Sequence, residues 1–137
     1  MPKPREVFVS HSSHDDRDAD ELVRFLRRHR IKTFYSPHHI RGGRRWQREI
    51  GAALQRCDWF LVLLTPSAVK SMWVEREVQY ALNVEHYRER IVPLLLCPCD
   101  YESLSWALST IQLVNVTGGI ESAYPELCRL WKIRYAP

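Results

Sequence analysis

Short apolar runs alternate along the chain with segments in which apolar residues recur every three or four positions. Runs of the first kind are typical of strands, and the longer periodic segments are typical of helices that bury one face. The run from Phe60 to Leu64 is apolar throughout, as expected for a strand buried on both faces. The apolar runs predict five strands, at residues 7–9, 31–35, 60–64, 91–96 and 111–116.

Helical periodicity fills the intervals between these strands, at residues 19–26, 46–54, 74–82 and 122–133, with a short helical connection at 104–108. Ser13 and Asp16 have the spacing of a capping box before the first helix. Pro93 lacks a main-chain donor, so we expect it near the start of its strand or at an irregularity. The alternation of strand and helix predicts an α/β fold: a flavodoxin-like, doubly wound, five-stranded parallel sheet with helices on both faces.

The composition fits one globular domain, with 45% apolar and 26% charged residues. We expect this domain to occupy residues 1–137, either as a whole protein or as a part cut from a longer chain. The longest apolar run, Trp59 to Leu64, is far shorter than the roughly 20 residues of a membrane-spanning helix. The N-terminus lacks the pattern of a secretory signal. We therefore expect a cytoplasmic protein without membrane contact, in which the four cysteines are reduced thiols.

The positive charges are unevenly spread, and arginines gather at residues 24–30 and 41–48. The first group fits the solvated face of a helix. The second, "HHIRGGRRWQR" at residues 38–48, joins two glycines, four arginines and a tryptophan where a loop meets a helix. Main-chain donors at such a junction favour phosphate groups. Nucleic-acid binding would require basic residues along one continuous face, so we do not expect a nucleic-acid partner.

In parallel sheets, ligands bind outside the carboxyl ends of the strands. That rule selects the loops at residues 10–15, 36–45, 65–73 and 96–101. In "SMWVEREVQYAL", residues 71–82, Trp73 and Glu77 are four positions apart and therefore lie on one side of a helix, while Glu75 lies at the opposite border. Two interpretations remain open: Trp73 and Glu77 belong to a binding site, or Trp73 packs at the core edge and Glu77 pairs with an arginine such as Arg76 or Arg45.

Four segments together resemble the Toll/interleukin-receptor (TIR) domain, particularly the bacterial type that consumes NAD. They are "VFVSHSSHDD", "FYSPHHIRGGRRWQREIGAAL", "FLVLLTPSAVKSMWVEREVQYAL" and "IVPLLL". The most specific element is the run Ser71, Trp73 and Glu77. The resemblance implies that Glu77 is the catalytic residue for NAD cleavage and that Ser10, His11 and Trp46 line the substrate site. Many members carry an acid after the second strand, where this chain has Tyr35, Ser36 and Pro37.

The chemistry of NAD suits a single carboxylate. Nicotinamide leaves ribose from a cationic pyridinium without a general acid, through an oxocarbenium-like transition state. Glu77 would stabilise that developing positive charge, and the effect strengthens in a pocket poor in water. Trp46 and Trp73 would supply flat walls, and the arginines of 41–48 would receive the pyrophosphate. The complete set of predicted substrate-binding residues is Ser10, His11, Ser36, Arg44, Arg45, Trp46, Ser71 and Trp73.

NAD is then a substrate, and no cofactor is expected. We also expect no metal, since adjacent histidines (His38, His39) and the Cys97-Pro98-Cys99 run do not have the spacing of a structural zinc site. The resemblance implies release of nicotinamide with formation of ADP-ribose or a cyclic isomer, a signal for a downstream effector in bacterial antiviral defence. It also implies self-association into TIR assemblies, in which a neighbour closes the site. The alternative is a non-catalytic TIR module that acts by homotypic association.

Overall fold

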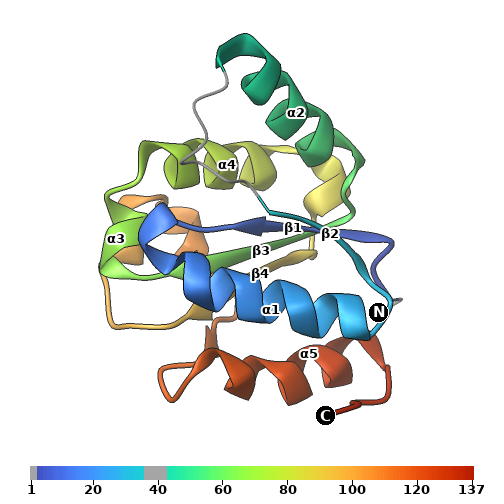
Figure 1. Cartoon of the computed structure of the whole chain (residues 1–137). Coiled ribbons are helices and arrows are strands. Elements are labelled where there is room, and N and C mark those ends of the chain that lie inside the picture. Colours follow the sequence, from blue (N-terminus) through green and yellow to red (C-terminus); the bar gives the residue numbers. More distant parts are fainter. Residues whose placement is uncertain (1–2, 36–42) are drawn as a thin grey trace.

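A computed structural model describes residues 3–35 and 43–137 of the chain. Five parallel strands form one sheet in the order β2-β1-β3-β4-β5, with helices on both faces (Figure 1). The predicted fold class is therefore confirmed. None of the described helices is long and apolar enough to cross a membrane. The strands are β1 (Glu6–Ser10), β2 (Lys32–Tyr35), β3 (Trp59–Leu64), β4 (Ile91–Leu95) and β5 (Val114–Asn115).

The helices connect the strands and divide between the two faces of the sheet. In Figure 1, α1 and α5 cover one face, and α2 and α4 cover the other. Five short 3-10 turns complete the described segments, at Ser13–Asp15, Glu85–Tyr87, Tyr101–Ser103, Trp106–Thr110 and Ile120–Ser122. The α-helices are α1 (Asp16–Arg28), α2 (Gly43–Arg56), α3 (Pro66–Val69), α4 (Met72–Asn83) and α5 (Ala123–Trp131).

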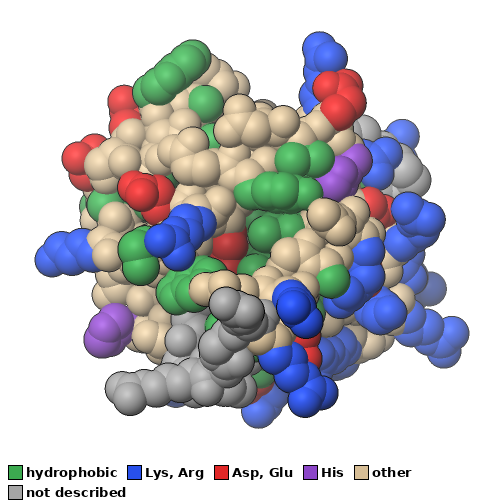
Figure 2. Space-filling model, turned by 90° about the horizontal axis from the view of Figure 1, so that it is seen from above, with side chains coloured by type: hydrophobic (Ala, Val, Ile, Leu, Met, Phe, Trp, Pro, Cys, Tyr) green, Lys and Arg blue, Asp and Glu red, His purple; other side chains and the backbone are tan. Residues whose placement is uncertain are grey.

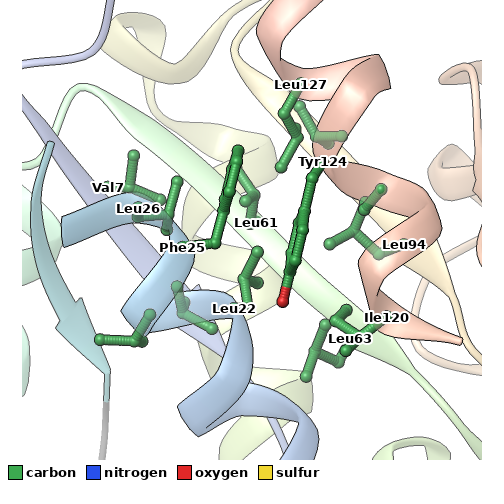
Figure 3. Packing of buried hydrophobic residues seen from close by; sticks show 14 of the residues in the cluster. Val7, Leu22, Phe25, Leu26, Leu61, Leu63, Leu94, Ile120, Tyr124 and Leu127 are labelled. Carbon is green, nitrogen blue, oxygen red and sulfur yellow. The ribbon is translucent and has the colours of Figure 1, made fainter. Parts of the chain in front are cut away.

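Alternation along the strands produces two separate apolar layers. Val7 and Val9 of β1 pack with the α1 and α5 side chains, whereas Phe8 packs with those of α2 and α4. In the first layer, Phe25 of α1 stacks on Tyr124 of α5 with ring centroids 4.1 Å apart (Figure 3). This alternation decides the position of every residue at the end of β1, where the candidate site lies.

The fifth strand is shorter than the pattern predicts, and Pro93 explains part of the difference. Leu95 accepts a main-chain bond from Val116 on the β5 side, whereas Leu96 donates to Leu64 of β3. Because alternate residues of a parallel strand bond to opposite neighbours, Pro93 also faces the β5 side. Pairing with β5 begins only at Leu94. Pro93 thus lies at the irregular edge expected for it, where no main-chain donor is needed.

Candidate active site

Glu77 and Ser10 meet at the carboxyl end of β1. Ser10 follows Phe8 on the sheet face that α4 covers, and Glu77 lies on the buried face of α4 beside Val74 and Val78. The Ser10 hydroxyl donates a hydrogen bond of 2.6 Å to Oε1 of Glu77, and both residues are 0% exposed. Glu75, in contrast, is exposed. The structure therefore turns Glu77, and not Glu75, toward the sheet edge where ligands of this fold class bind.

The burial of Glu77 is costly for a charged group. A carboxylate taken out of water must be hydrogen-bonded to remain ionised without a large energetic penalty. The Ser10 hydroxyl supplies one such bond, beside buried apolar residues of β1 and α4. A group held in this way is positioned, which suits a carboxylate that must meet a developing positive charge at a fixed point.

The start of α4 places Trp73 above Glu77. Ser71 is the N-cap of the helix, and its hydroxyl accepts a hydrogen bond of 3.2 Å from the Val74 amide. Trp73 therefore occupies the first turn, half-buried, and the guanidinium of Arg76 lies over its ring at 5.5 Å from the centroid. The predicted residues Ser10, Ser71, Trp73 and Glu77 all lie at this junction of β1 with α4.

His11 lies on the other side of β1. Its ring is buried, its Nε2 is 2.8 Å from Oδ1 of Asp16, and its centroid is 5.8 Å from that of Tyr35. Tyr35 packs against the α1 and α5 layer, so consecutive residues Ser10 and His11 point to opposite faces of the sheet. His11 therefore lies on the opposite face of the sheet from Glu77, and its predicted role in substrate binding stays a prediction.

The predicted capping box at Ser13 and Asp16 is wrong. Ser12 caps the turn before α1, because its hydroxyl accepts a hydrogen bond of 3.3 Å from the His14 amide. Asp16 is the first residue of α1, and its carboxylate contacts the His11 ring. Adjacent serines at residues 12 and 13 made the two registers indistinguishable in the sequence.

Trp46 is largely buried. It is 9% exposed and packs in the α2 and α4 layer with Ile50 and Leu54. This position agrees with its helical spacing to Ile50 and Leu54. Contact with a ligand is a separate matter, and the predicted role of Trp46 as a pocket wall stays a prediction.

The remaining predicted residues lie in or beside the segment that precedes α2. Arg45 projects into solvent with its side chain 91% exposed, and its Nε is 3.9 Å from Oε1 of Glu49. Ser36 and the histidines at 38 and 39 lie outside the described residues, and of Arg44 only the helical main chain is described. In the described part of the chain, no group of three or more metal-ligating side chains comes together.

A pocket of about 460 Å³ opens beside Trp73. It brings two of the predicted loops together, since one wall comes from the turn after β1 and the other from α3 and the start of α4. On the α2 side of the molecule, seen in Figure 2, acidic side-chain atoms lie near the centre among hydrophobic side chains, whereas the pocket beside Trp73 has no acidic lining residue. The pocket is lined by Ser12, Ser13, His14, Ser67, Lys70, Ser71 and Trp73. Sequence reasoning selected Ser71 and Trp73 but missed Lys70, which carries no motif.

Comparison with known proteins identifies the family. A sequence profile of the TIR domain matches residues 7–130. The chain belongs to the TIR-domain family. The match covers every described strand except the first residue of β1, together with all of the candidate site described above.

Two curated relatives of this TIR domain carry an activity in their names. The chain is 24% identical over 94 residues to "Probable 2' cyclic ADP-D-ribose synthase TcpO" of Methanobrevibacter olleyae, covering 68% of this chain and 28% of the relative. It is 29% identical over 82 residues to "2' cyclic ADP-D-ribose synthase BtTIR" of Bacteroides thetaiotaomicron, covering 57% of this chain and 29% of the relative. The matched region thus spans less than a third of each relative.

Solved TIR structures agree with the fold. The TIR domain of the Toll-related receptor TRR-2 of Hydra magnipapillata superimposes with a TM-score of 0.71 at 21% identity, covering 92% of this chain and 97% of the other. The TIR domains of the activated Roq1 resistosome, which directly recognises the pathogen effector XopQ, give a TM-score of 0.57 at 17% identity, covering 93% and 80%. At these identities the likeness concerns the fold alone.

Proposed function

We propose that this TIR domain cleaves NAD between nicotinamide and ribose, with Glu77 as the catalytic carboxylate. The observation that carries the proposal is the position of Glu77, buried one helical turn below Trp73 and held by Ser10 at the carboxyl edge of the sheet. The two relatives named as cyclic ADP-ribose synthases support the same reaction class.

The proposed reaction needs few groups. The bond between the nicotinamide nitrogen and the anomeric carbon breaks, and nicotinamide leaves as a neutral molecule with the bonding electron pair. Glu77 stabilises the positive charge that develops on the ribose. Water then attacks the anomeric carbon to give ADP-ribose and a proton, or a hydroxyl of the same molecule attacks to give a cyclic isomer and a proton.

The structure also limits how the substrate approaches. Glu77 is 0% exposed and bonded to Ser10, so a ribose can reach the carboxylate only if neighbouring groups move or exchange hydrogen bonds. A ribose hydroxyl has the same donor chemistry as the Ser10 hydroxyl and can replace it at Oε1. Trp73, one helical turn from Glu77 on α4, would then shield the reacting carbon from bulk water.

The direct test is to incubate the purified domain with NAD and to separate the products by chromatography against nicotinamide, ADP-ribose and cyclic ADP-ribose standards. We expect one nicotinamide for each NAD consumed, together with one of the two ribose products. Absence of nicotinamide release at every protein concentration tested would contradict the proposed reaction.

We further propose that the active form is an assembly of TIR domains in the cytosol, producing a signal for a downstream effector in antiviral defence. In the sequence, Ser36 stands where many members of the family have an acid, so a neighbouring domain would complete the wall of the site. The TIR domains of a resistosome provide a precedent for assembly of this fold. Activity per molecule should rise with protein concentration, and strict proportionality from nanomolar to tens of micromolar would contradict the assembly.

A second candidate function is a non-catalytic module that associates with other TIR domains. The full burial of Glu77 and its bond to Ser10 also fit a purely structural polar contact. Such a module would self-associate in sedimentation experiments but release no nicotinamide from NAD, which separates the two candidates.

A further inference from the structure

We propose that Lys70 and the hydroxyl groups of the pocket beside Trp73 bind the diphosphate of the dinucleotide. This assignment rests on the proposed NAD cleavage, and it gives the diphosphate to Lys70 in place of the arginines that the sequence suggested at residues 41–48. We refer to the pocket lined by Ser12, Ser13, His14, Ser67, Lys70, Ser71 and Trp73 as the serine–lysine pocket.

The serine–lysine pocket adjoins the proposed catalytic carboxylate. Trp73 forms one of its walls and lies one helical turn from Glu77 on α4. On the opposite wall, Ser12 follows two residues after Ser10, whose hydroxyl bonds to Glu77. A dinucleotide with its nicotinamide ribose at Glu77 can therefore extend its neighbouring diphosphate into this pocket.

The hydroxyl groups of the pocket are arranged as donors. Ser12 Oγ accepts a hydrogen bond from the His14 amide, and Ser71 Oγ accepts one from the Val74 amide. Because a hydroxyl that accepts a main-chain bond still carries its own hydrogen, each side chain can donate one further bond. Phosphoryl oxygens are acceptors only, so a ring of such donors complements them.

The serine–lysine pocket carries positive charge, which complements the negative charge of a diphosphate. Lys70 is exposed, and no ion pair within residues 3–35 and 43–137 engages it. None of the lining residues is acidic. The adjacent carboxylate of Asp15 accepts a hydrogen bond of 2.6 Å from Thr65, outside the pocket lining. The N-terminus of the twelve-residue helix α4 also meets the pocket at Ser71, and its dipole adds to the preference for an anion.

Arg45 belongs to the arginine-rich segment, which is the alternative site for the diphosphate. Its side chain is almost fully in solvent and lies near Glu49, so its charge is partly offset by an acid on the same helix. Lys70 forms no ion pair in the described part of the chain, and it lines a concave pocket of about 460 Å³. Phosphate binding is stronger in a concave site with several donors than at a single solvated charge.

The assignment can be tested by binding, without any turnover. Amide chemical shifts would be followed by NMR while ADP-ribose, which contains the diphosphate but no nicotinamide bond, is added to the wild type and to single variants. We expect Lys70→Gln to weaken ADP-ribose binding by about tenfold, more at low salt, as expected for a charge-assisted contact. Lys70→Arg should retain most of the affinity, and Lys132→Gln at the end of α5 should match the wild type. Amides of residues 12–14 and 67–73 should shift on binding.

Adenosine, which lacks phosphate, provides the matched ligand control, and its affinity should be unaffected by Lys70→Gln. The assignment would be overturned if Lys70→Gln bound ADP-ribose as tightly as the wild type, if it lost adenosine equally, or if Arg45→Gln alone lost affinity. Absence of ADP-ribose binding to the wild type would overturn it as well. NAD cleavage by the wild type is measured separately. If the wild type cleaves NAD but Lys70→Gln binds ADP-ribose normally, only the diphosphate site is rejected. If the wild type does not cleave NAD but Lys70→Gln weakens ADP-ribose binding as predicted, only the proposed cleavage is rejected.

Discussion

Ser10 and Glu77 are linked by a side-chain hydrogen bond of 2.6 Å although 67 residues separate them in the sequence. The bond joins the last residue of β1 to the middle of α4, and both residues are buried. Apolar residues of β1 and α4 surround it, and the bond helps to fix the direction of the carboxylate. The proposed function depends on that direction.

Replacing Ser10 with alanine removes one donor to a buried carboxylate. We expect Ser10→Ala to lower the free energy of unfolding by about 1–3 kcal/mol, the usual cost of weakening a buried hydrogen bond. NAD cleavage should also fall, because the carboxylate loses its fixed position. Denaturant unfolding and nicotinamide release would be measured in parallel, with the exposed Ser109→Ala as control. Unchanged stability together with unchanged activity would show that the bond has no positioning role.

Substitution of Trp46 distinguishes a role in core packing from a role in ligand contact. Because its side chain is nearly buried beside Ile50 and Leu54, Trp46→Ala should lower the free energy of unfolding by about 3 kcal/mol or more. Trp46→Phe should recover much of that loss by refilling part of the cavity. A Trp46→Ala variant that unfolds like the wild type but no longer binds NAD would place Trp46 in the pocket wall rather than the core.

The four cysteines should react in two classes. Cys97 is exposed and Cys99 half-exposed, while Cys57 and Cys128 are buried. Burial raises the pKa of the Cys57 thiol to about 12, so little of the reactive thiolate forms at neutral pH. Titration of the native protein with a disulfide reagent should therefore modify Cys97 first, and Cys57 and Cys128 only after denaturant is added. Rapid modification of Cys57 in the native state would contradict the packing of α2 against the sheet.

Alkaline pH should weaken the α1 and α5 layer through Tyr124. Burial raises the pKa of its phenol from 10.0 to about 12, so the unfolded chain releases this proton at lower pH than the folded chain. Stability due to Tyr124 is then complete below pH 10 and is lost between pH 10 and 12, with a slope of at most about 1.4 kcal/mol per pH unit. When the free energy of unfolding is measured with denaturant across that pH range, it should fall less steeply with pH for Tyr124→Phe than for the wild type. Equal slopes would contradict the burial of this phenol.

Much of the fold could be predicted because the local signals agree with one another. The periodicity of α4 separated Glu77 from Glu75, and Trp73 indicated which border of the helix mattered. The helical spacing of Trp46, Ile50 and Leu54 likewise agreed with their burial in α2. In both helices, the spacing of apolar residues along the sequence predicts which side chains are buried.

Other features depend on contacts between distant segments. The short pairing of β5 follows in part from the missing donor at Pro93, which no local pattern in residues 111–116 reveals. The direction of His11 is decided by Asp16 and Tyr35 on the opposite face from Ser10. The serine–lysine pocket forms only when the turn after β1 meets α3 and α4, so Lys70 gave no signal on its own.

The role of Glu77 is tested most directly by comparing Glu77→Gln with Glu75→Gln for NAD cleavage. Both variants keep the shape of the side chain and remove one charge from the same helix, but only Glu77 is buried against β1. With folding verified by circular dichroism, we expect Glu77→Gln to abolish nicotinamide release and Glu75→Gln to retain most of it. Turnover of NAD at the wild-type rate by the folded Glu77→Gln variant would contradict the account.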